Sequence, residues 1–119
     1  KMFNTVYVPP AHNIGWLVPP WLKNGWQLII GDSRKELPKL ISRISPIDVF
    51  LHDSLHTDEH VKFELETVFP FMREDGLMLA DDVNDYWSLT FVDWCAHNQI
   101  PFTVFGNRLG IAVVKRAFL

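Results

Sequence analysis

Residues 47–60 read IDVFLHDSLHTDEH, an apolar run followed at once by two aspartates, a glutamate and three histidines. Ile47–His52 has the length and apolar character of a buried strand. Beyond the polar stretch, apolar residues recur at helical spacing and predict a helix from about Thr57 to Phe71. A strand, a polar loop and a helix in succession form the repeating unit of a parallel α/β sheet, so this stretch predicts the fold class.

The same alternation is predicted upstream and downstream of this stretch. Upstream, Gln27–Ile30 has the pattern of a short strand that Gly31 ends. A helix is expected from about Leu37, because Pro38 suits a first helical turn. Downstream, Leu77–Ala80 is the third predicted strand.

The C-terminal third predicts one more helix and a hairpin. Asn84 or Asp85 can cap the helix, whose expected inward residues are Trp87, Phe91, Trp94 and Cys95. Ile100–Phe105 and Leu109–Lys115 are predicted strands joined across Gly106-Asn107, a turn pair typical of hairpins. The whole pattern predicts an α/β sheet that is mostly parallel and ends in an antiparallel hairpin.

Residues 1–26 differ in composition from the rest of the chain, since they are rich in proline and tryptophan. Paired prolines block a regular helix or a central strand. We expect extended, irregular chain with a short strand at Thr5–Val8, and we expect its large aromatic side chains to be buried. The predicted division is therefore a lead segment, 1–26, and an α/β domain, 27–119.

Composition argues against several classes of function. The 119 residues are 48% hydrophobic and 21% charged, which suits one globular domain. A net charge of −3 without a basic block argues against a nucleic-acid partner. Apolar runs are only strand-length, and no signal-peptide pattern occurs at the start. With Cys95 as the single cysteine, we expect a cytoplasmic protein without disulfides or a membrane partner, and a buried thiol rather than a nucleophile.

Acidic side chains follow all three predicted parallel strands. Asp32 comes after the first strand, Asp53 after the second, and Asp81 and Asp82 after the third. Ligands bind beyond the carboxyl ends of such strands, and carboxylates gathered there need a positive partner. A divalent cation such as Mg²⁺ is one solution. Capping of the following helix or turn is the other reading, and it is favoured for Asp32 taken alone.

Three histidines near the second strand invite different readings. His52 should point away from Asp53 and pack against a helix, because neighbouring strand residues face opposite sides. His60 is expected to be exposed on the helix. His56, three residues after Asp53, is either a general base or an ordinary first-turn residue. A zinc site of Asp53, His56 and His60 is a weaker hypothesis, because Thr57 stands where an H-E-x-x-H motif has glutamate.

Three segments together resemble a known family. LIIGDSRKELPKLI, IDVFLHDSLHTDEH and FMREDGLMLADDV are similar to consecutive motifs of class I S-adenosylmethionine-dependent methyltransferases. The subgroup is methyltransferase family 24, which is related to catechol-type and sugar O-methyltransferases. GWLVPPWLKNGW also resembles the segment before that family's third strand. The resemblance covers about residues 14–115 and implies a Rossmann-like sheet with the strand order 3-2-1-4-5-7-6.

The resemblance also implies a site and a chemistry. Gly31, Asp32 and Ser33 match the end of the family's third strand. There the acidic residue or its neighbour approaches the adenine of S-adenosylmethionine in the family. Asp53, Asp81 and Asp82 match metal ligands of the catechol-type enzymes, for Mg²⁺ or another divalent cation. His56 stands where those enzymes have a lysine general base. The implied activity is transfer of a methyl group to a hydroxyl of a small molecule.

Part of the family's pattern is absent. The Gly-rich cofactor loop, the acidic residue that holds the ribose and the first two strands have no counterpart in this sequence. Either the chain is a methyltransferase or a piece of one, or it is a non-catalytic remnant that serves as a dimeric binding module. Met2 as a natural start would favour the second reading. The open sheet edge predicts a homodimer; the alternative is that the lead segment covers this edge with Thr5–Val8 as a substitute strand, although its prolines limit the pairing.

Overall fold

The computed structural model describes residues 8–116, and the chain divides into two compact units, residues 1–30 and 31–119. The strand predicted at Thr5–Val8 lies almost wholly outside the described residues. Within the described range, no helix has the length and apolar character needed to cross a membrane.

In the first unit, the described residues form turns and one short 3-10 helix, Pro20–Gly25. Pro20 suits the first position of a helix, where its missing N–H costs nothing. Gly15 has a φ of 87°, and a Cβ there would lie 2.5 Å from the Trp26 ring. Only glycine therefore allows this turn to pack against Trp26.

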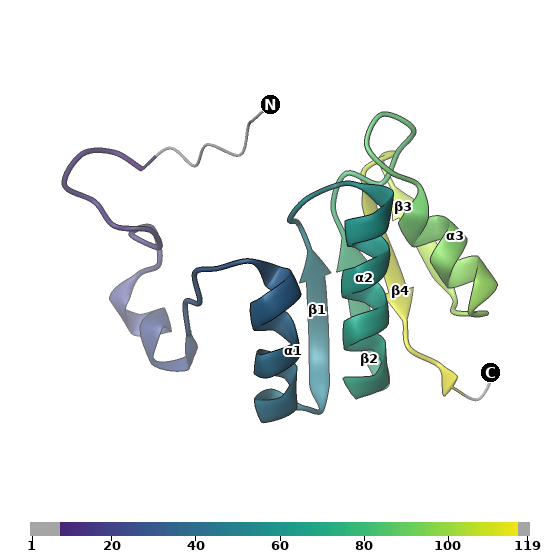
Figure 1. Ribbon diagram of the computed structural model, residues 1–119, viewed down its shortest axis with the longest axis horizontal. Helices are drawn as coiled ribbons and strands as arrows, with labels where there is room; N and C mark the ends of the chain where they lie inside the picture. Colours follow the sequence, from purple (N-terminus) through teal and green to yellow (C-terminus); the bar gives the residue numbers. More distant parts are fainter. Residues whose placement is uncertain (1–7, 117–119) are drawn as a thin grey trace. The chain divides into compact units, whose positions relative to one another are not determined.

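The second unit is built on a four-stranded sheet with the order β1-β2-β4-β3 (Figure 1). Its strands are β1 (Ile47–His52), β2 (Met72–Ala80), β3 (Phe102–Phe105) and β4 (Leu109–Val113). β1 is parallel to β2, while β4 is antiparallel to both β2 and β3. The predicted α/β fold with a C-terminal hairpin is confirmed, and the order matches the 4-5-7-6 part of the expected sheet. The sheet is mixed and not mostly parallel, because only β1 and β2 form a parallel pair.

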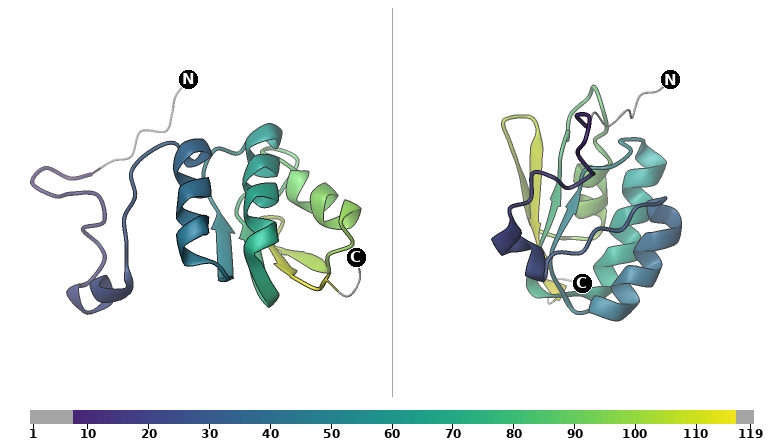
Figure 2. Two further views of the ribbon diagram at one scale, coloured as in Figure 1. Left: turned by 60° about the horizontal axis from the view of Figure 1, so that its bottom comes forward. Right: turned by 90° about the vertical axis from the view of Figure 1, so that its left-hand side faces the viewer.

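Three helices pack on one face of this sheet: α1 (Ser33–Ile44), α2 (Asp58–Val68) and α3 (Thr90–His97) (Figure 2). Asp32 caps α1, since its Oδ1 accepts from the Arg34 N–H at 2.9 Å. Thr57 caps α2 in the same way through the His60 N–H. The core between helices and sheet includes Leu65, Met78, Phe91, Ala112 and Val114.

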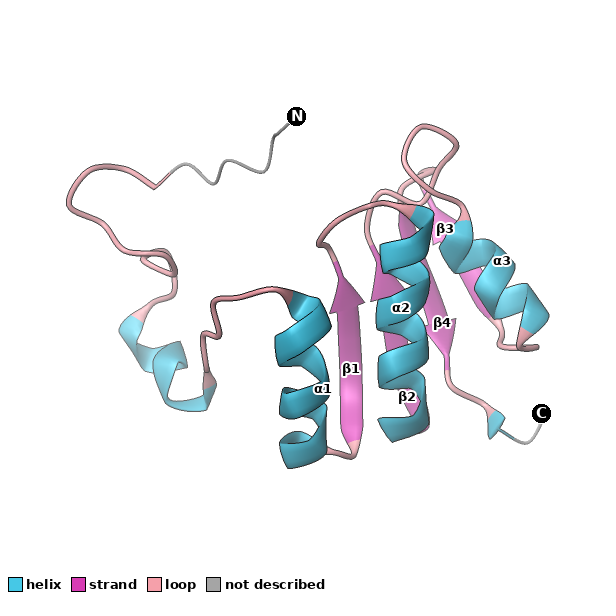
Figure 3. Cartoon of the chain, in the orientation of Figure 1, coloured by secondary structure: helices cyan, strands magenta, loops and turns pink. Residues whose placement is uncertain are grey.

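Two expectations around α1 are wrong. Residues 26–30 run as irregular chain, not as a strand (Figure 3). The helix begins at Ser33, four residues earlier than the expected Leu37, because Asp32 supplies the cap directly before it. Pro38 is therefore inside the helix, where it leaves one carbonyl of the preceding turn without a backbone partner.

The start of α3 also differs from the prediction. Asn84 caps a tight turn, because its Oδ1 accepts from the N–H groups of Tyr86 and Trp87. The helix begins only at Thr90, and Trp87 is half-exposed instead of inward. Cys95 is fully buried as expected, and burial raises the pKa of its thiol to about 12.

Candidate ion-binding site

The carboxyl ends of β1 and β2 bring two polar loops together. His52 pairs with Ala80 in the parallel ladder, and the Asp81 N–H donates to the His52 carbonyl oxygen at 3.0 Å. The loop of residues 53–57 therefore leaves the sheet beside the loop of residues 81–89. This rim is the place where open α/β sheets bind ligands.

Three side chains from these loops form what we call the ion cluster: Asp53, His56 and Asp82. His56 Nε2 lies 3.2 Å from Asp82 Oδ2 and 3.6 Å from Asp53 Oδ1. One ligand atom from each residue lies within 4.8 Å of the others. Two carboxylates at this spacing can bind one divalent cation together, and the imidazole beside them can serve either as a further ligand or as a base.

The backbone at Asp82 is unusual. Its φ of 55° lies in the left-handed region, which aspartate and asparagine tolerate better than most residues. This turn follows directly on β2, so Asp81 and Asp82 diverge although they are neighbours.

Asp81 lies beside the ion cluster, but its carboxylate faces Arg108. The Arg108 Nε and Nη2 groups donate to the two Asp81 carboxylate oxygens at 3.0 and 3.4 Å. These bonds hold the pKa of Asp81 below its ordinary value. Arg108 Nε is also 3.8 Å from Asp82 Oδ1, so one guanidinium partly balances both carboxylates.

The His56 ring is enclosed by aromatic neighbours. Its centroid lies 5.6 Å from that of Trp87, and 5.3 Å from that of His52 in an edge-to-face arrangement. Its side chain is 14% exposed. The imidazole is therefore held in place while its Nε2 faces the two carboxylates.

Behind the loop lies a second set of polar residues, which we call the Glu64 cluster: Ser33, His52, Ser54, His60 and Glu64. Glu64 Oε1 accepts from His52 Nδ1 at 2.8 Å. Oε2 accepts from Ser33 and Ser54 at 2.6 and 2.9 Å, and it lies 2.9 Å from His60 Nε2. Burial by itself would raise the pKa of Glu64, but the bonds from His52, Ser33 and Ser54 lower it to about 2.

Glu64 is a site residue that the sequence pattern did not indicate, and His60 lies in a different environment from the one predicted. His60 was expected to be exposed, yet it is only 4% exposed because it packs beside Glu64. His52 packs against α2, as expected. The signal for Glu64 was its position between Val61 and Leu65 on the buried face of α2, where a carboxylate needs partners.

Gly31, Asp32 and Ser33, the expected cofactor contacts, form the entry to α1. A Cβ at Gly31 would lie 2.9 Å from Glu36 Cγ, so the turn is tight. Asp32 caps the helix, and Ser33 belongs to the Glu64 cluster. Ser33 and Ser54 both bond to Glu64, so the start of α1 is linked to the loop that carries Asp53 and His56.

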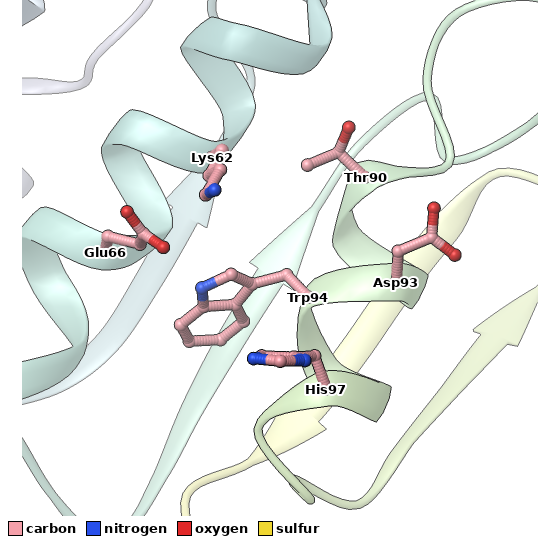
Figure 4. A pocket seen from close by; sticks show the side chains of 6 residues that line it. All are labelled: Lys62, Glu66, Thr90, Asp93, Trp94 and His97. Carbon is pink, nitrogen blue, oxygen red and sulfur yellow. The ribbon is translucent and has the colours of Figure 1, made fainter.

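A surface pocket of about 380 Å³ lies elsewhere, between α2 and α3 (Figure 4). Lys62 and Glu66 reach it from α2. The α3 side consists of Thr90, Asp93, Trp94 and His97. All six residues that line this pocket lie on α2 and α3, and none of them belongs to the ion cluster.

Comparison with known proteins gives a consistent result. A family model described as a methyltransferase domain matches residues 8–83. Demethylmacrocin O-methyltransferase of Streptomyces fradiae is 32% identical over 62 residues, which are 50% of this chain and 16% of that protein.

Solved structures of the MycE methyltransferase from the mycinamycin biosynthetic pathway share the fold. One, in complex with Mg and SAH, has a TM-score of 0.60 and 23% identity. Another, in complex with Mg, SAH and mycinamycin VI, has a TM-score of 0.60 and 20% identity. In both cases the match covers 71% of this chain and 30% of the MycE chain. The chain thus spans less than a third of the length of these proteins.

Proposed function

Because the chain belongs to the class I S-adenosylmethionine-dependent methyltransferases, we propose that it carries the ion-binding side of an O-methyl transfer to a hydroxyl of a small molecule. The observation that supports this most directly is the ion cluster, in which two carboxylates and an imidazole meet at the rim where the fold binds ligands. The chain also shares its fold with MycE, whose structure is described in complex with Mg and SAH, and this similarity supports the same chemistry.

Asp53 and Asp82 would hold the divalent ion, since both carboxylates face the same point. Asp81 is a further ligand in this proposal, and it becomes available when Arg108 releases it. When bound, the ion lowers the pKa of the acceptor hydroxyl, and S-adenosylmethionine supplies the electrophilic methyl group. We place the cofactor's adenine near Gly31, Asp32 and Ser33.

His56 is the proposed general base. The acceptor oxygen forms a bond to the methyl carbon as the carbon–sulfur bond breaks, and the hydroxyl proton passes to the imidazole. The positive charge that His56 gains then lies between Asp53 and Asp82. Trp87 and His52 keep the ring facing the rim.

Calorimetric titration of the 119-residue chain with Mg²⁺, and with S-adenosylmethionine in the presence and absence of Mg²⁺, tests the proposal. We expect saturable Mg²⁺ binding that Asp53→Ala abolishes or strongly weakens. Unaltered binding in Asp53→Ala would remove the ion cluster from the proposal.

The two loop histidines separate a chemical role from a structural one. Where methyl transfer is measured, both variants should lower the rate, His56→Ala more than His52→Ala, because only His56 faces the carboxylates of the ion cluster while His52 acts through its contact with the His56 ring. Equal losses would assign His56 a packing role.

Homodimerisation is a second proposal, and the sheet edge supports it. β1 is an edge strand, and its Val49 and Leu51 side chains are 55% and 53% exposed. Apolar, unpaired edges recruit partners, and a two-fold axis is the simplest arrangement. This edge would also serve a non-catalytic binding module. Sedimentation equilibrium decides: a monomer of 13.8 kDa at micromolar concentration contradicts the dimer.

A further inference from the structure

The loop that follows β1 has two faces. Asp53 and His56 face the ion cluster, whereas His52 and Ser54 on either side of Asp53 bond to Glu64. Successive residues of extended chain point to opposite sides, which produces this division. Asp53 is therefore held between two residues that are both tied to one buried carboxylate.

Glu64 connects four segments of the second unit. Its partners are Ser33 at the start of α1, His52 at the end of β1, Ser54 in the loop and His60 on α2 itself. The carboxylate is buried with its residue only 4% exposed. Bonds to an ionised acceptor in such surroundings are short and strong, so they fix the groups that donate them.

Glu64 does not touch His56 directly but is linked to it through the ring of His52. The His52 ring is fixed through Nδ1 by Glu64, and its ring meets that of His56 at a centroid distance of 5.3 Å and an interplanar angle of 83°. A shift of His52 would therefore move the surface against which His56 rests.

From these contacts we infer that Glu64 is a positioning residue for the ion cluster: its carboxylate sets the placement of Asp53 through His52 and Ser54, and of His56 through His52. The inference rests on the proposed function as far as the ion is concerned. The carboxylate is needed in ionised form, because only then do both oxygens accept from every partner. An amide at the same position offers one acceptor oxygen and two N–H donors.

The test compares Glu64→Gln with Glu66→Gln, the same substitution two residues along α2 at an exposed position. Mn²⁺ alone is the probe, and free Mn²⁺ is counted by electron paramagnetic resonance. We expect Glu64→Gln to weaken Mn²⁺ binding about 10- to 100-fold, the usual effect of losing a group that orients metal ligands. Glu66→Gln should bind as the unchanged chain does.

Backbone hydrogen exchange without any ion supplies an independent measurement. In Glu64→Gln, the amides of residues 53–57 should exchange faster, while those of β2 and β4 keep their rates. Unchanged exchange in the loop overturns the inference whatever the Mn²⁺ affinity, and so does faster exchange with unaltered Mn²⁺ binding. If the unchanged chain binds no Mn²⁺, the proposal that this cluster binds an ion is wrong. The positioning role of Glu64 is then judged only from the hydrogen exchange of residues 53–57.

Ser54→Ala keeps the inference testable where Glu64→Gln does not fold. It removes one bond to Glu64 and leaves the carboxylate in place, so a smaller change in the same direction is expected in both measurements. Its control is Ser42→Ala on α1, where an exposed hydroxyl bonds only to the nearby Lys39 carbonyl. Identical loop exchange in these two variants would contradict the inference.

Discussion

The ion cluster and the Glu64 cluster lie on opposite faces of one loop. Both combine histidine with acidic residues at short distances, and the Glu64 cluster also contains Ser33 and Ser54. They differ in burial and in balance. Glu64 is buried and surrounded by donors, whereas Asp53 is largely exposed and Asp82 partly so, with two carboxylates sharing His56. In the first arrangement both oxygens of the carboxylate accept hydrogen bonds within the protein. In the second, two carboxylates share one imidazole and can also bind a cation. The same residue types therefore serve structure or chemistry according to what surrounds them.

The strongest way to break this comparison is to remove the buried carboxylate. Glu64→Ala leaves the donors of His52, Ser33 and Ser54 without their acceptor in the interior. We expect the free energy of unfolding to fall by about 3 kcal/mol or more, measured by urea denaturation. Glu66→Ala, at an exposed position of the same helix, should change it by less than about 0.5 kcal/mol. Equal losses in the two variants would mean that Glu64 contributes no more to the free energy of unfolding than an exposed glutamate of the same helix.

Acid should reproduce part of that loss in the unchanged chain. The pKa of Glu64 is lowered to about 2 from an ordinary value of 4.5. Its contribution to stability is therefore complete above about pH 4.5 and is lost as the pH falls through about 2. The loss is on the order of 3 kcal/mol. It is measured as the difference in unfolding free energy between the unchanged chain and Glu64→Gln from pH 6 to pH 2. A difference that stays constant over this range would contradict the low pKa.

Substitution in the ion cluster should weaken ion binding and leave the stability of the fold nearly unchanged. Asp82→Asn keeps a residue that tolerates the left-handed backbone and removes one carboxylate. We expect Mn²⁺ affinity to drop by at least about 10-fold, while the unfolding free energy without ions changes by less than about 0.5 kcal/mol. A large loss of ion-free stability would show that this cluster is structural too.

The smallest expected effect concerns Arg108, which lies at the edge of the ion cluster. Arg108→Gln removes a positive charge that pairs with Asp81 and approaches Asp82. Mn²⁺ affinity should rise several-fold, since the cation no longer competes with the guanidinium. The matched control is Arg73→Gln, because Arg73 also pairs with one aspartate, Asp48, and its side chain is mostly exposed, as that of Arg108 is. A fall in affinity would mean that Arg108 supports the site instead of competing with it.

What the sequence by itself determined is the fold class and the location of the chemistry. The strand–loop–helix pattern at residues 47–60, the hairpin across Gly106-Asn107 and the acidic residues after successive strands depend on local spacing, which a sequence displays directly. Because parallel neighbouring strands end at the same rim, the approach of Asp53 to Asp82 follows from topology. The predicted start of α1 is wrong, because Asp32 caps the helix at Ser33 although this places Pro38 inside it.

Only the tertiary structure decided which side chains share an environment. Asp81 and Asp82 are neighbours, yet a positive φ after β2 sends one to Arg108 and the other to His56. Glu64 and Ser33 are 31 residues apart and meet only because α1 and α2 pack on the same face of the sheet. Burial and partner choice depend on contacts between distant segments, and these contacts turn one group of acids and histidines into a buried anchor and another into a candidate ion site.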